Sequence, residues 1–448
     1  MALTGIEIFK LLPKTNCGEC GVPTCLAFAM SLAAGKAELS ACPYISDEAR
    51  EKLDEASAPP IRPVTIGVGE KALKVGGETV MFRHEKRFEN PPGLAILISD
   101  TMADDEIDSR LERCRNLVYE RVGLTLRPEL VALKCDSGDT AKFGALVDKV
   151  KQNSDCGIIL MSENPDLLAA GLKACGDRKP LIYTATKDNA EQVAALAKEH
   201  SCPIASKANG LEELAELTTK LTQDGIKDIV IDSGARAVRQ TFEDQIAIRR
   251  AALDKKFRPL GFPTIVFANE MADNPMKEAM IAATFIAKYG GIIVLSDFQG
   301  ESLFPLLVMR MNVYTDPQRP LATTEGIYEI GGPDENSPVV LTSNFSLTYF
   351  IVSGEIENSR VPCYLLVKDT EGLSVMTAWA AGKFGSDTIG PFIKKCGITD
   401  KVKHRKLIIP GYIAIESGGL EEELSDWEIM VGPREGAHMP AYLKTWKA

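Results

Sequence analysis

Four cysteines near the start of the chain have a spacing that suits a metal centre. They follow the pattern C-x2-C-x4-C-x16-C and are Cys17, Cys20, Cys25 and Cys42. Thiolate sulfur is the usual protein ligand of iron–sulfur clusters and a common ligand of structural zinc. Gly18 and Gly21 lie between these cysteines. Glycine there lets the backbone fold tightly and present N–H groups to sulfur, which tunes the potential of a cluster.

The spacing distinguishes between the possible metals. Structural zinc favours two C-x2-C pairs, and this segment has only one. The common ferredoxin spacings are not matched either, although Pro43 directly follows the fourth cysteine. We therefore predict one [4Fe-4S] cluster in a module that is not a standard ferredoxin. Zinc and a chance gathering of cysteines are the less favoured alternatives.

The chain has eleven cysteines among 448 residues, and seven of them are scattered singly outside this module. An odd, dispersed set argues against the disulfide framework of a secreted protein. We expect these seven to be reduced thiols that act as small buried hydrophobic side chains. They are Cys114, Cys135, Cys156, Cys175, Cys202, Cys363 and Cys396.

Composition excludes several classes of protein. Hydrophobic residues make up 45% and charged residues 25%, as in an ordinary globular protein. The net charge of -11 argues against a nucleic acid or an anionic membrane as the main partner. No apolar run approaches the ~20 residues that span a bilayer, and the first residues lack a signal-peptide pattern. We expect a cytoplasmic protein.

The chain divides into regions of different pattern. Residues 1–57 hold the clustered cysteines and helical segments, with so little core that a metal would help to stabilise them. Residues 58–92 read as a linker with a β-hairpin around the turn signal Gly76-Gly77. Residues 325–448 alternate strand and helix patterns, which predicts a small parallel Rossmann-like sheet.

Residues 93–315 repeat one pattern eight times. A short β-branched apolar run is followed in most repeats by a helical pattern such as DSRLERCRNLVYERV (108–122). Eight such units predict a (β/α)8 TIM barrel, whereas an open doubly wound sheet needs no particular count. The apolar runs occupy residues 94–100, 130–136, 156–162, 180–186, 202–208, 228–234, 263–269 and 290–297. The predicted fold class is α/β, with this barrel between a cluster domain and a Rossmann-like domain.

Three stretches resemble one family closely. They are NCGECGVPTCLAFAM (16–30) with Cys42-Pro43, LTSNFSLTYFIVSGEIE (341–357) and LLVKDTEGLSVMTAWAAGKF (365–384). They are similar to the large subunit of the corrinoid iron–sulfur protein, whose archaeal counterpart is the gamma subunit of the acetyl-CoA decarbonylase/synthase complex. The resemblance covers essentially the whole chain. It implies a cluster domain, a barrel and a C-terminal corrinoid-binding domain, in that order.

The resemblance implies a methyltransferase-class methyl carrier of the reductive acetyl-CoA (Wood–Ljungdahl) pathway. In such a carrier, corrinoid Co(I) takes a methyl group from methyltetrahydrofolate through a methyltransferase. Methyl-Co(III) then gives it to the nickel–iron cluster of acetyl-CoA synthase/CO dehydrogenase. The [4Fe-4S] cluster returns inactive Co(II) to Co(I). The implied partners also include a small subunit, which completes a heterodimer, and a low-potential electron donor such as ferredoxin.

The histidines agree with a corrinoid that has no histidine ligand. Corrinoid domains with a histidine below the cobalt use a D-x-H-x-x-G signature. None of His84, His200, His404 and His438 matches it. If a corrinoid is bound, as the resemblance implies, it would be base-off and without a histidine axial ligand of that type, which eases reduction of the cobalt.

The resemblance places the corrinoid at the carboxyl ends of the C-terminal strands, where such sheets bind ligands. The alternative is that the matching residues are ordinary turn and helix-cap residues. Two loops carry most of the candidates, and the later strands carry the rest. The candidates are Thr342, Ser343, Asn344, Thr348, Thr370, Glu371, Gly372, Leu373, Ser374, Gly411, Gly432, Arg434, Gly436 and Ala437.

Two other functions remain open. The first is an electron carrier, or a reductive activator of a corrinoid protein, in which only the cluster acts. The second is a catalytic barrel, because polar residues follow its predicted strands. These residues form no metal-spaced set and no nucleophile–base pair, so we expect a scaffold. They are Asp100, Lys134, Asp136, Glu163, Asn164, Lys207, Asn209, Asp232, Asn269, Glu270 and Asp297.

Overall fold

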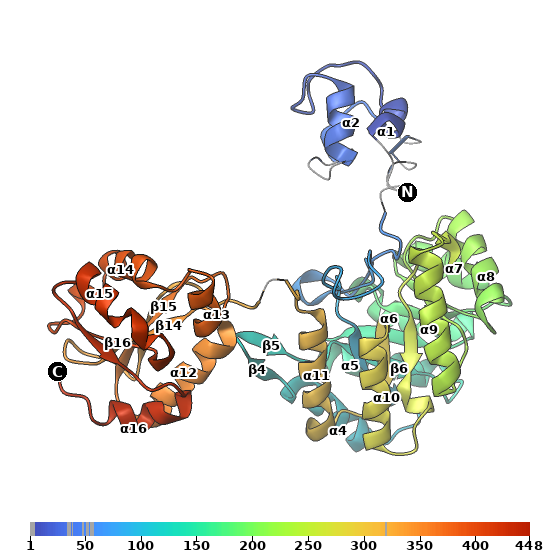
Figure 1. Ribbon diagram of the computed structural model, residues 1–448. Coiled ribbons are helices and arrows are strands. Elements are labelled where there is room, and N and C mark those ends of the chain that lie inside the picture. The colour runs from blue at the N-terminus through green and yellow to red at the C-terminus, as the bar shows by residue number, and fades with distance from the viewer. Residues whose placement is uncertain are drawn as a thin grey trace. The chain divides into compact units, whose positions relative to one another are not determined.

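The computed structural model describes residues 5–33, 37, 39–46, 49–50, 53, 58–318 and 320–448. The chain forms two compact units (Figure 1). The first unit comprises Met1–Val118 and Arg127–Tyr314, and the second comprises Tyr119–Leu126 and Thr315–Ala448. Within the described residues, no helix is long and apolar enough to cross a membrane.

The cysteine-rich module is helical where it is described. It contains α1 (Gly5–Leu11), α2 (Cys25–Ala33) and the short 3-10 helix η1 (Leu39–Ala41). Ile8, Leu12 and Phe28 form a small core together with Cys25 and Cys42. Most of residues 47–57, the end of the predicted cluster domain, lies outside the described residues.

The linker contains a strand pair, but not where the sequence predicted it. β1 (Val64–Ile66) pairs antiparallel with β2 (Leu73–Val75) around a turn that contains η2 (Gly69–Lys71). The predicted turn at Gly76-Gly77 is therefore wrong, because these residues follow the second strand. Both have positive φ, and a side chain on Gly76 would collide with the backbone of Arg62. The lack of a side chain at Gly76 thus lets two backbone segments lie close together, and the two glycines do not form the hairpin turn.

The predicted (β/α)8 barrel is confirmed. All eight strands are parallel and lie in the order β10-β9-β8-β7-β6-β3-β12-β11. A bridge between Ile231 and Thr264 joins the two end strands, so the barrel is nearly closed. The strands are β3 (Gly93–Ser99), β6 (Leu130–Lys134), β7 (Gly157–Met161), β8 (Leu181–Ala185), β9 (Ile204–Lys207), β10 (Ile229–Asp232), β11 (Ile265–Phe267) and β12 (Ile292–Leu295).

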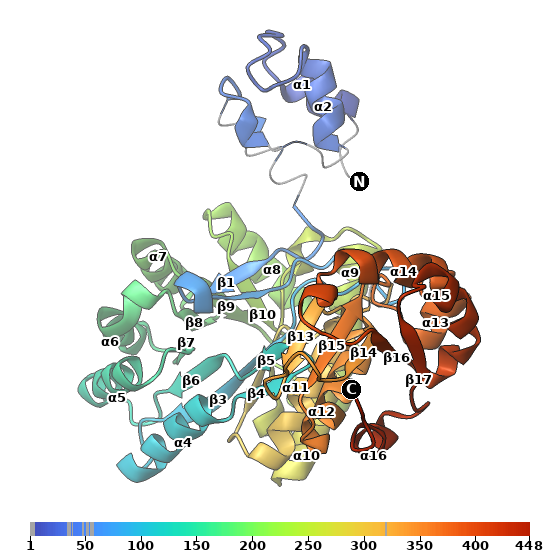
Figure 2. The same ribbon diagram turned by 90° about the vertical axis from the view of Figure 1, so that its left-hand side faces the viewer.

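Each barrel strand is followed by a helix on the outside (Figure 2). The barrel interior is filled by inward apolar side chains of all eight strands, so it is a packed core and not a pore. Val64, Ile66 and Val75 of the β1–β2 pair belong to the same core. The helices are α4 (Asp104–Asn116), α5 (Thr140–Asn153), α6 (Pro165–Cys175), α7 (Ala190–His200), α8 (Leu211–Gln223), α9 (Val238–Leu253), α10 (Pro275–Ala287) and α11 (Gly300–Tyr314).

One helix is shorter than its pattern predicted. The helical pattern of residues 108–122 ends as α4 at Asn116, and a hairpin of β4 (Tyr119–Arg121) and β5 (Leu124–Leu126) follows. Val122 and Gly123 between these strands both have positive φ, as a two-residue type I′ turn requires. The hairpin belongs to the second unit, although the residues before and after it in the sequence belong to the first.

The second unit contains a five-stranded sheet in the order β13-β15-β14-β16-β17. β14 (Val339–Ser343), β15 (Cys363–Lys368), β16 (Lys406–Ile409) and β17 (Glu428–Val431) are parallel, as expected. The edge strand β13 (Gly326–Ile330) is antiparallel, so the expectation of a wholly parallel sheet is wrong at this edge.

Helices cover both faces of this sheet (Figure 1). On one face, α13 (Val375–Ala380), α14 (Ser386–Lys395) and α15 (Ser417–Glu423) pack on Leu341 and Leu366. On the other face, α12 (Ser346–Ser359) and α16 (Met439–Leu443) pack on Val340 and Leu365. The alternation of side chains along each strand thus produces a doubly wound α/β domain, which is the predicted Rossmann-like architecture.

Candidate cofactor sites

The four N-terminal cysteines lie in one small module. Cys17 and Cys20 belong to the loop between α1 and α2, Cys25 is the first residue of α2, and Cys42 follows η1. Cys17 is exposed and Cys20 is half-buried, whereas Cys25 and Cys42 are buried. All four are free thiols.

Asn16 organises the loop that carries these thiols, and the sequence analysis did not single it out. Its side-chain oxygen accepts a 2.8 Å hydrogen bond from the backbone N–H of Cys25. Its own backbone N–H donates to the Cys25 sulfur at 3.4 Å. A backbone N–H directed at a cysteine sulfur is the kind of contact that tunes iron–sulfur clusters. The only local sign of this role was a polar residue directly before the first cysteine.

The four thiols of this module are the kind of ligand that binds an iron–sulfur cluster, although the structure does not bring them into metal-binding positions. Among the described residues, no three His, Cys, Asp or Glu side chains lie close enough to hold a metal ion. Metal sites of small modules are commonly assembled by the metal itself, because binding and folding are coupled. Gly18 and Gly21 have positive φ, and no atom lies within 4 Å of where a β-carbon would stand. The backbone there is open to a ligand.

The topology of the C-terminal sheet defines where a ligand would bind. From β14 the chain crosses to β15 on one side and then to β16 on the other, so its direction reverses between β14 and β16. Open α/β sheets bind ligands outside the carboxyl ends of the strands at such a switch point. Thr342 and Ser343 end β14, Asn344 directly follows it, and Gly411 follows β16. The predicted candidates therefore lie at the edge that the topology selects.

Two hydroxyl groups at this edge lack hydrogen-bond partners. Thr342 and Ser343 are 1% and 0% exposed, and neither hydroxyl oxygen has a partner in the described part of the chain. A buried hydroxyl without a hydrogen bond costs roughly 1–3 kcal/mol by protein mutational data. Both groups are therefore available to a ligand that would enter at the end of β14. Two buried hydroxyls without partners at the end of a strand are what a site for a large polar cofactor would offer.

Asn344 joins the two predicted loops but has no free acceptor capacity of its own. Its side-chain oxygen accepts from Thr370 N–H, the Thr370 hydroxyl and Gly372 N–H at 2.9, 2.9 and 3.0 Å. Its side-chain amide donates to Asp369 at 2.8 Å. The same Asp369 oxygen accepts the backbone N–H of Glu371. Asn344 thus positions the loop after β15, and Asp369 supports it although the sequence analysis did not name Asp369 as a site residue.

The remaining candidates of the second loop form a tight turn. Glu371 and Gly372 have φ of 58° and 76°, and Leu373 N–H donates to Thr370 carbonyl oxygen. A β-carbon on Gly372 would lie 2.9 Å from the carbonyl oxygen of Pro320, so this glycine serves a close contact within the protein. Leu373 packs against the apolar core, and Ser374 bonds to Thr377. Thr348 lies half-buried in the first turns of α12.

The candidates after the last two strands also approach one another. Gly411 N–H donates to Pro433 carbonyl oxygen, and a β-carbon on Gly411 would lie 2.5 Å from the carbonyl oxygen of Gly432. Arg434 is exposed, and Gly436 contacts Ile351 of α12. Ala437 is exposed in the short helix η8 (Gly436–His438). These loops line the same edge of the sheet as Thr342.

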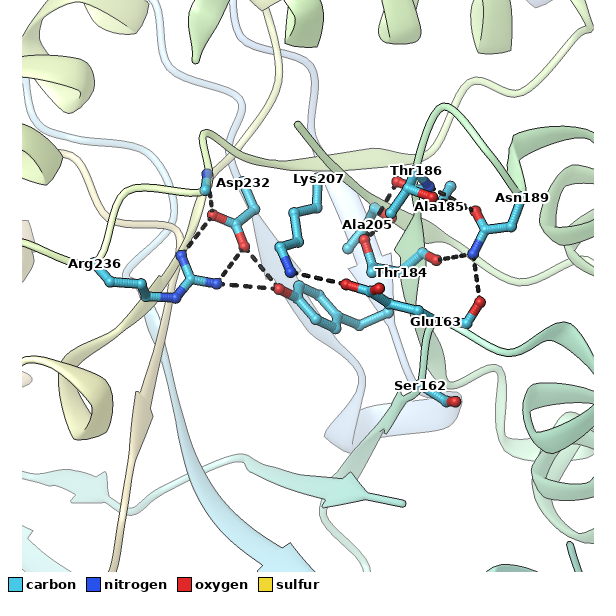
Figure 3. A network of polar contacts seen from close by, with 12 residues as sticks. Ser162, Glu163, Thr184, Ala185, Thr186, Asn189, Ala205, Lys207, Asp232 and Arg236 are labelled. Atoms are coloured by element: carbon cyan, nitrogen blue, oxygen red, sulfur yellow. Dashed lines mark hydrogen bonds and ion pairs between the residues drawn. The ribbon is translucent and has the colours of Figure 1, made fainter. Parts of the chain in front are cut away.

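The polar residues at the mouth of the barrel bind mainly one another (Figure 3). Arg236 donates to both oxygens of Asp232, to the Tyr183 hydroxyl and to Glu270. Tyr183 donates to Asp232 at 2.8 Å. Lys207 pairs with Glu163 at 2.8 Å.

Further pairs continue this pattern around the mouth. Lys134 pairs with Asp136, and Arg113 pairs with Asp297. Burial, followed by the charge of Asp232, raises the pKa of Tyr183 well above its usual value. Such a phenol stays protonated at neutral pH, so it can donate a hydrogen bond but cannot act as a base. These side chains thus largely satisfy one another's charges and hydrogen bonds.

A cysteine module, a parallel barrel and a switch-point sheet with unpaired hydroxyls together define a cofactor-carrying α/β protein. Residues 63–443 match the family model of the CO dehydrogenase/acetyl-CoA synthase delta subunit. A second model, for an Fe-S cluster, matches residues 12–44, which include all four N-terminal cysteines.

Two relatives are similar over almost their whole lengths. The chain is 47% identical to the corrinoid/iron-sulfur protein large subunit of Moorella thermoacetica, over 99% of both chains. It is 37% identical to the acetyl-CoA decarbonylase/synthase complex subunit gamma of Methanopyrus kandleri, over 99% of this chain and 97% of the relative. The chain belongs to the family of corrinoid/iron-sulfur protein large subunits.

One solved structure has a weaker likeness. The dihydropteroate synthase of Yersinia pestis covers 49% of this chain and 95% of its own, with 11% identity and a TM-score of 0.37.

Proposed function

We propose that this chain is the cluster- and corrinoid-bearing subunit of a methyl carrier in acetyl-CoA synthesis. The observation that carries the proposal is the pair of buried, unpartnered hydroxyls of Thr342 and Ser343 at the switch point of the C-terminal sheet. Family membership supports it, because relatives are named for both a corrinoid and an iron–sulfur group.

The residues have separate roles in this proposal. Cys17, Cys20, Cys25 and Cys42 would hold a [4Fe-4S] cluster, with Asn16 donating to the Cys25 sulfur. Thr342 and Ser343 would donate to a base-off corrinoid, while Asn344 holds the loop after β15 in place. When bound, the corrinoid supplies a cobalt centre that accepts and passes on a methyl group, and the cluster supplies the low-potential electron that restores that centre.

The partners follow from the same assignment. A relative is named as a large subunit and another as part of an acetyl-CoA decarbonylase/synthase complex. We extend this to a small-subunit partner, a methyltetrahydrofolate methyltransferase, acetyl-CoA synthase and a ferredoxin-like electron donor, all in the cytoplasm. The chain would then be a methyltransferase-class carrier that acts only with partner enzymes.

Metal analysis tests the proposal against a pure electron carrier. The full chain, co-expressed with its small subunit and purified without oxygen, should contain about one cobalt per heterodimer and four irons. Its visible spectrum should show a base-off corrinoid. Iron without cobalt would overturn the methyl carrier and favour the electron carrier.

A cysteine substitution separates electron delivery from methyl transfer. Cys20→Ser should leave methyl transfer to the chemically pre-reduced protein intact and abolish its reductive reactivation. Cys135→Ser is the matched control, because Cys135 lies in the barrel and a serine hydroxyl can keep the hydrogen bond that its thiol donates to Asp100. Equal loss of both activities in Cys20→Ser would mean that the cluster supports folding rather than electron transfer.

A further inference from the structure

Two of the cysteines outside the cluster module form a close pair inside the barrel unit. The sulfurs of Cys114 and Cys156 lie 3.0 Å apart, although the residues are 42 positions apart in sequence. Cys114 belongs to the last turn of α4 and is 0% exposed, and Cys156 directly precedes β7 and is 3% exposed. Two sulfurs in a disulfide are about 2.05 Å apart, so a small shift of either side chain would join them.

The surroundings of Cys156 favour its thiolate. Either thiol can donate the hydrogen bond between them. With Cys114 as the donor, this bond lowers the pKa of Cys156; burial opposes the shift, and Ser154 and Arg127 lower the pKa further. The same contact and burial raise the pKa of Cys114. One thiol of the pair stays protonated beside the sulfur that accepts from it, which is the arrangement of an attacking and a resolving cysteine. The Arg127 guanidinium lies 3.9 Å from the Cys156 sulfur, and this positive charge makes Cys156 the attacking cysteine.

One partly exposed side chain lies next to this pair. The Arg127 guanidinium lies 3.9 Å from the Cys156 sulfur and is held by Asp155 at 2.9 Å. Both Arg127 and Asp155 are partly exposed, at 28% and 49% of their side chains. A surface ion pair of this kind is worth about 0–1 kcal/mol, so we expect Arg127 to move aside readily when a small oxidant approaches the sulfur.

The position of the pair gives a cross-link a structural consequence. Cys114 ends the helix before the β4–β5 hairpin, and Arg127 directly follows that hairpin. The hairpin itself belongs to the second unit. A bond between Cys114 and Cys156 would therefore link the end of α4 to the start of β7. These two points lie close to where the chain leaves the barrel unit for the β4–β5 hairpin and returns from it.

We propose that Cys114 and Cys156 are a reversible redox pair that forms a disulfide under oxidising conditions. The oxidant is a low-molecular-weight disulfide. The Cys156 thiolate attacks one of its sulfurs and releases a small thiolate, and Cys114 then attacks the mixed disulfide and releases the second small thiol. Two electrons pass from the cysteines to the oxidant, and the two cysteine protons go to the two small thiols. In a reducing compartment the pair stays as thiols.

The test uses the full protein with its partner subunit, kept without oxygen in buffers of 2-mercaptoethanol and bis(2-hydroxyethyl) disulfide. After acid quenching, denaturation and alkylation, peptide mass spectrometry should detect a Cys114–Cys156 linkage in most molecules at high disulfide ratios. Dithiothreitol should reverse it. Cys175 and Cys202 are the matched controls, because burial raises the pKa of these thiols to about 12 and about 11, and both should remain alkylatable.

Single substitutions distinguish this pair from two independently reactive thiols. Cys114→Ala should still trap a mixed disulfide on Cys156 because Arg127 remains, but more slowly than in the wild type because the Cys114 hydrogen bond is lost. Cys156→Ala should leave Cys114 unmodified. If both cysteines remain alkylatable in the wild type, or if each carries its own adduct without a linkage, the proposal is overturned. The readout does not require cobalt or a cluster, so it can fail while the proposed methyl carrier stands.

Discussion

The side-chain oxygen of Asn344 accepts two hydrogen bonds from Thr370, one from its backbone N–H and one from its hydroxyl, each 2.9 Å long. Asn344 directly follows the central strand β14, and Thr370 begins the turn after β15. One amide thus holds together the two loops in which most corrinoid candidates lie. In the proposed carrier, we expect Asn344 to act on the corrinoid by positioning this loop.

Removing this amide should separate the loops. Asn344→Ala leaves the N–H groups of Thr370 and Gly372 without an acceptor, at a cost of about 2–4 kcal/mol in the free energy of unfolding. Corrinoid occupancy should fall at least ten-fold, and urea unfolding with cobalt analysis measures both effects. Asn344→Asp keeps the acceptor but faces Asp369, so occupancy should be intermediate. Normal occupancy in Asn344→Ala would exclude the positioning role.

The unpaired hydroxyl of Thr342 should matter to the ligand and not to the fold. Thr342→Val should leave the free energy of unfolding of corrinoid-free protein unchanged, or raise it by up to about 1 kcal/mol, because no hydrogen bond is lost. Corrinoid affinity should fall about five- to ten-fold, the worth of one hydrogen bond.

Thr370→Val is the matched control for that experiment. Thr370 is equally buried, but its hydroxyl has two acceptors for its one hydrogen, Asn344 Oδ1 at 2.9 Å and Leu373 carbonyl oxygen at 2.8 Å. The same change should therefore destabilise corrinoid-free protein by about 1–3 kcal/mol. If Thr342→Val is as destabilising as Thr370→Val, the hydroxyl of Thr342 has a partner within the protein.

A methyl group at Gly411 should disturb the loops after β16 and β17. Its β-carbon would lie 2.5 Å from Gly432 carbonyl oxygen and 2.9 Å from Arg434 nitrogen. Gly411→Ala should thus cost about 1–3 kcal/mol of stability and lower corrinoid occupancy. In contrast, Gly418 in α15 has open space, and Gly418→Ala should be neutral or stabilising by up to about 1 kcal/mol. Thermal unfolding and cobalt content of both variants test the pair.

Acid should weaken the barrel through Asp100. Burial alone would raise the pKa of Asp100, but hydrogen bonds from Ser137, Cys135 and the backbone of Asp136 outweigh it and hold the pKa below the usual 3.8. Since the folded pKa is depressed, the stabilisation is present above pH 3.8 and is lost as the pH falls through the folded value.

Asp100→Asn isolates this contribution. At pH 7 it should lower the stability of the barrel by about 1–3 kcal/mol, because the amide cannot accept all the hydrogen bonds that the carboxylate accepts. The difference from wild type should shrink as the pH falls below 3.8, and denaturant titrations over this range measure it. A constant difference at all pH values would contradict the assignment.

Local pattern was sufficient for the barrel but not for the segments that interrupt it. The period of strand and helix repeats eight times, and each repeat buries its own apolar stripe. The hairpin of β4 and β5 lacks such a stripe, since five of its six residues are not buried. The same holds for β13, in which only Ile330 is buried. Edge strands of this kind are stabilised by pairing with distant segments, so their own residues indicate them weakly.

The sequence by itself determined which chemical groups the protein has for binding cofactors. These are four cysteines at cluster spacing and two polar loops at strand ends, without a corrinoid-type histidine signature. Only the tertiary structure decided which side chains satisfy one another and which remain free. The side-chain oxygen of Asn344 accepts hydrogen bonds from residues 26 and 28 positions away in sequence. Cys114 contacts Cys156, which is 42 positions away, and the hydroxyl of Thr342 has no partner in the described chain. Hydrogen bonds and sulfur contacts require separations of a few ångströms, and the fold alone sets those distances between remote residues.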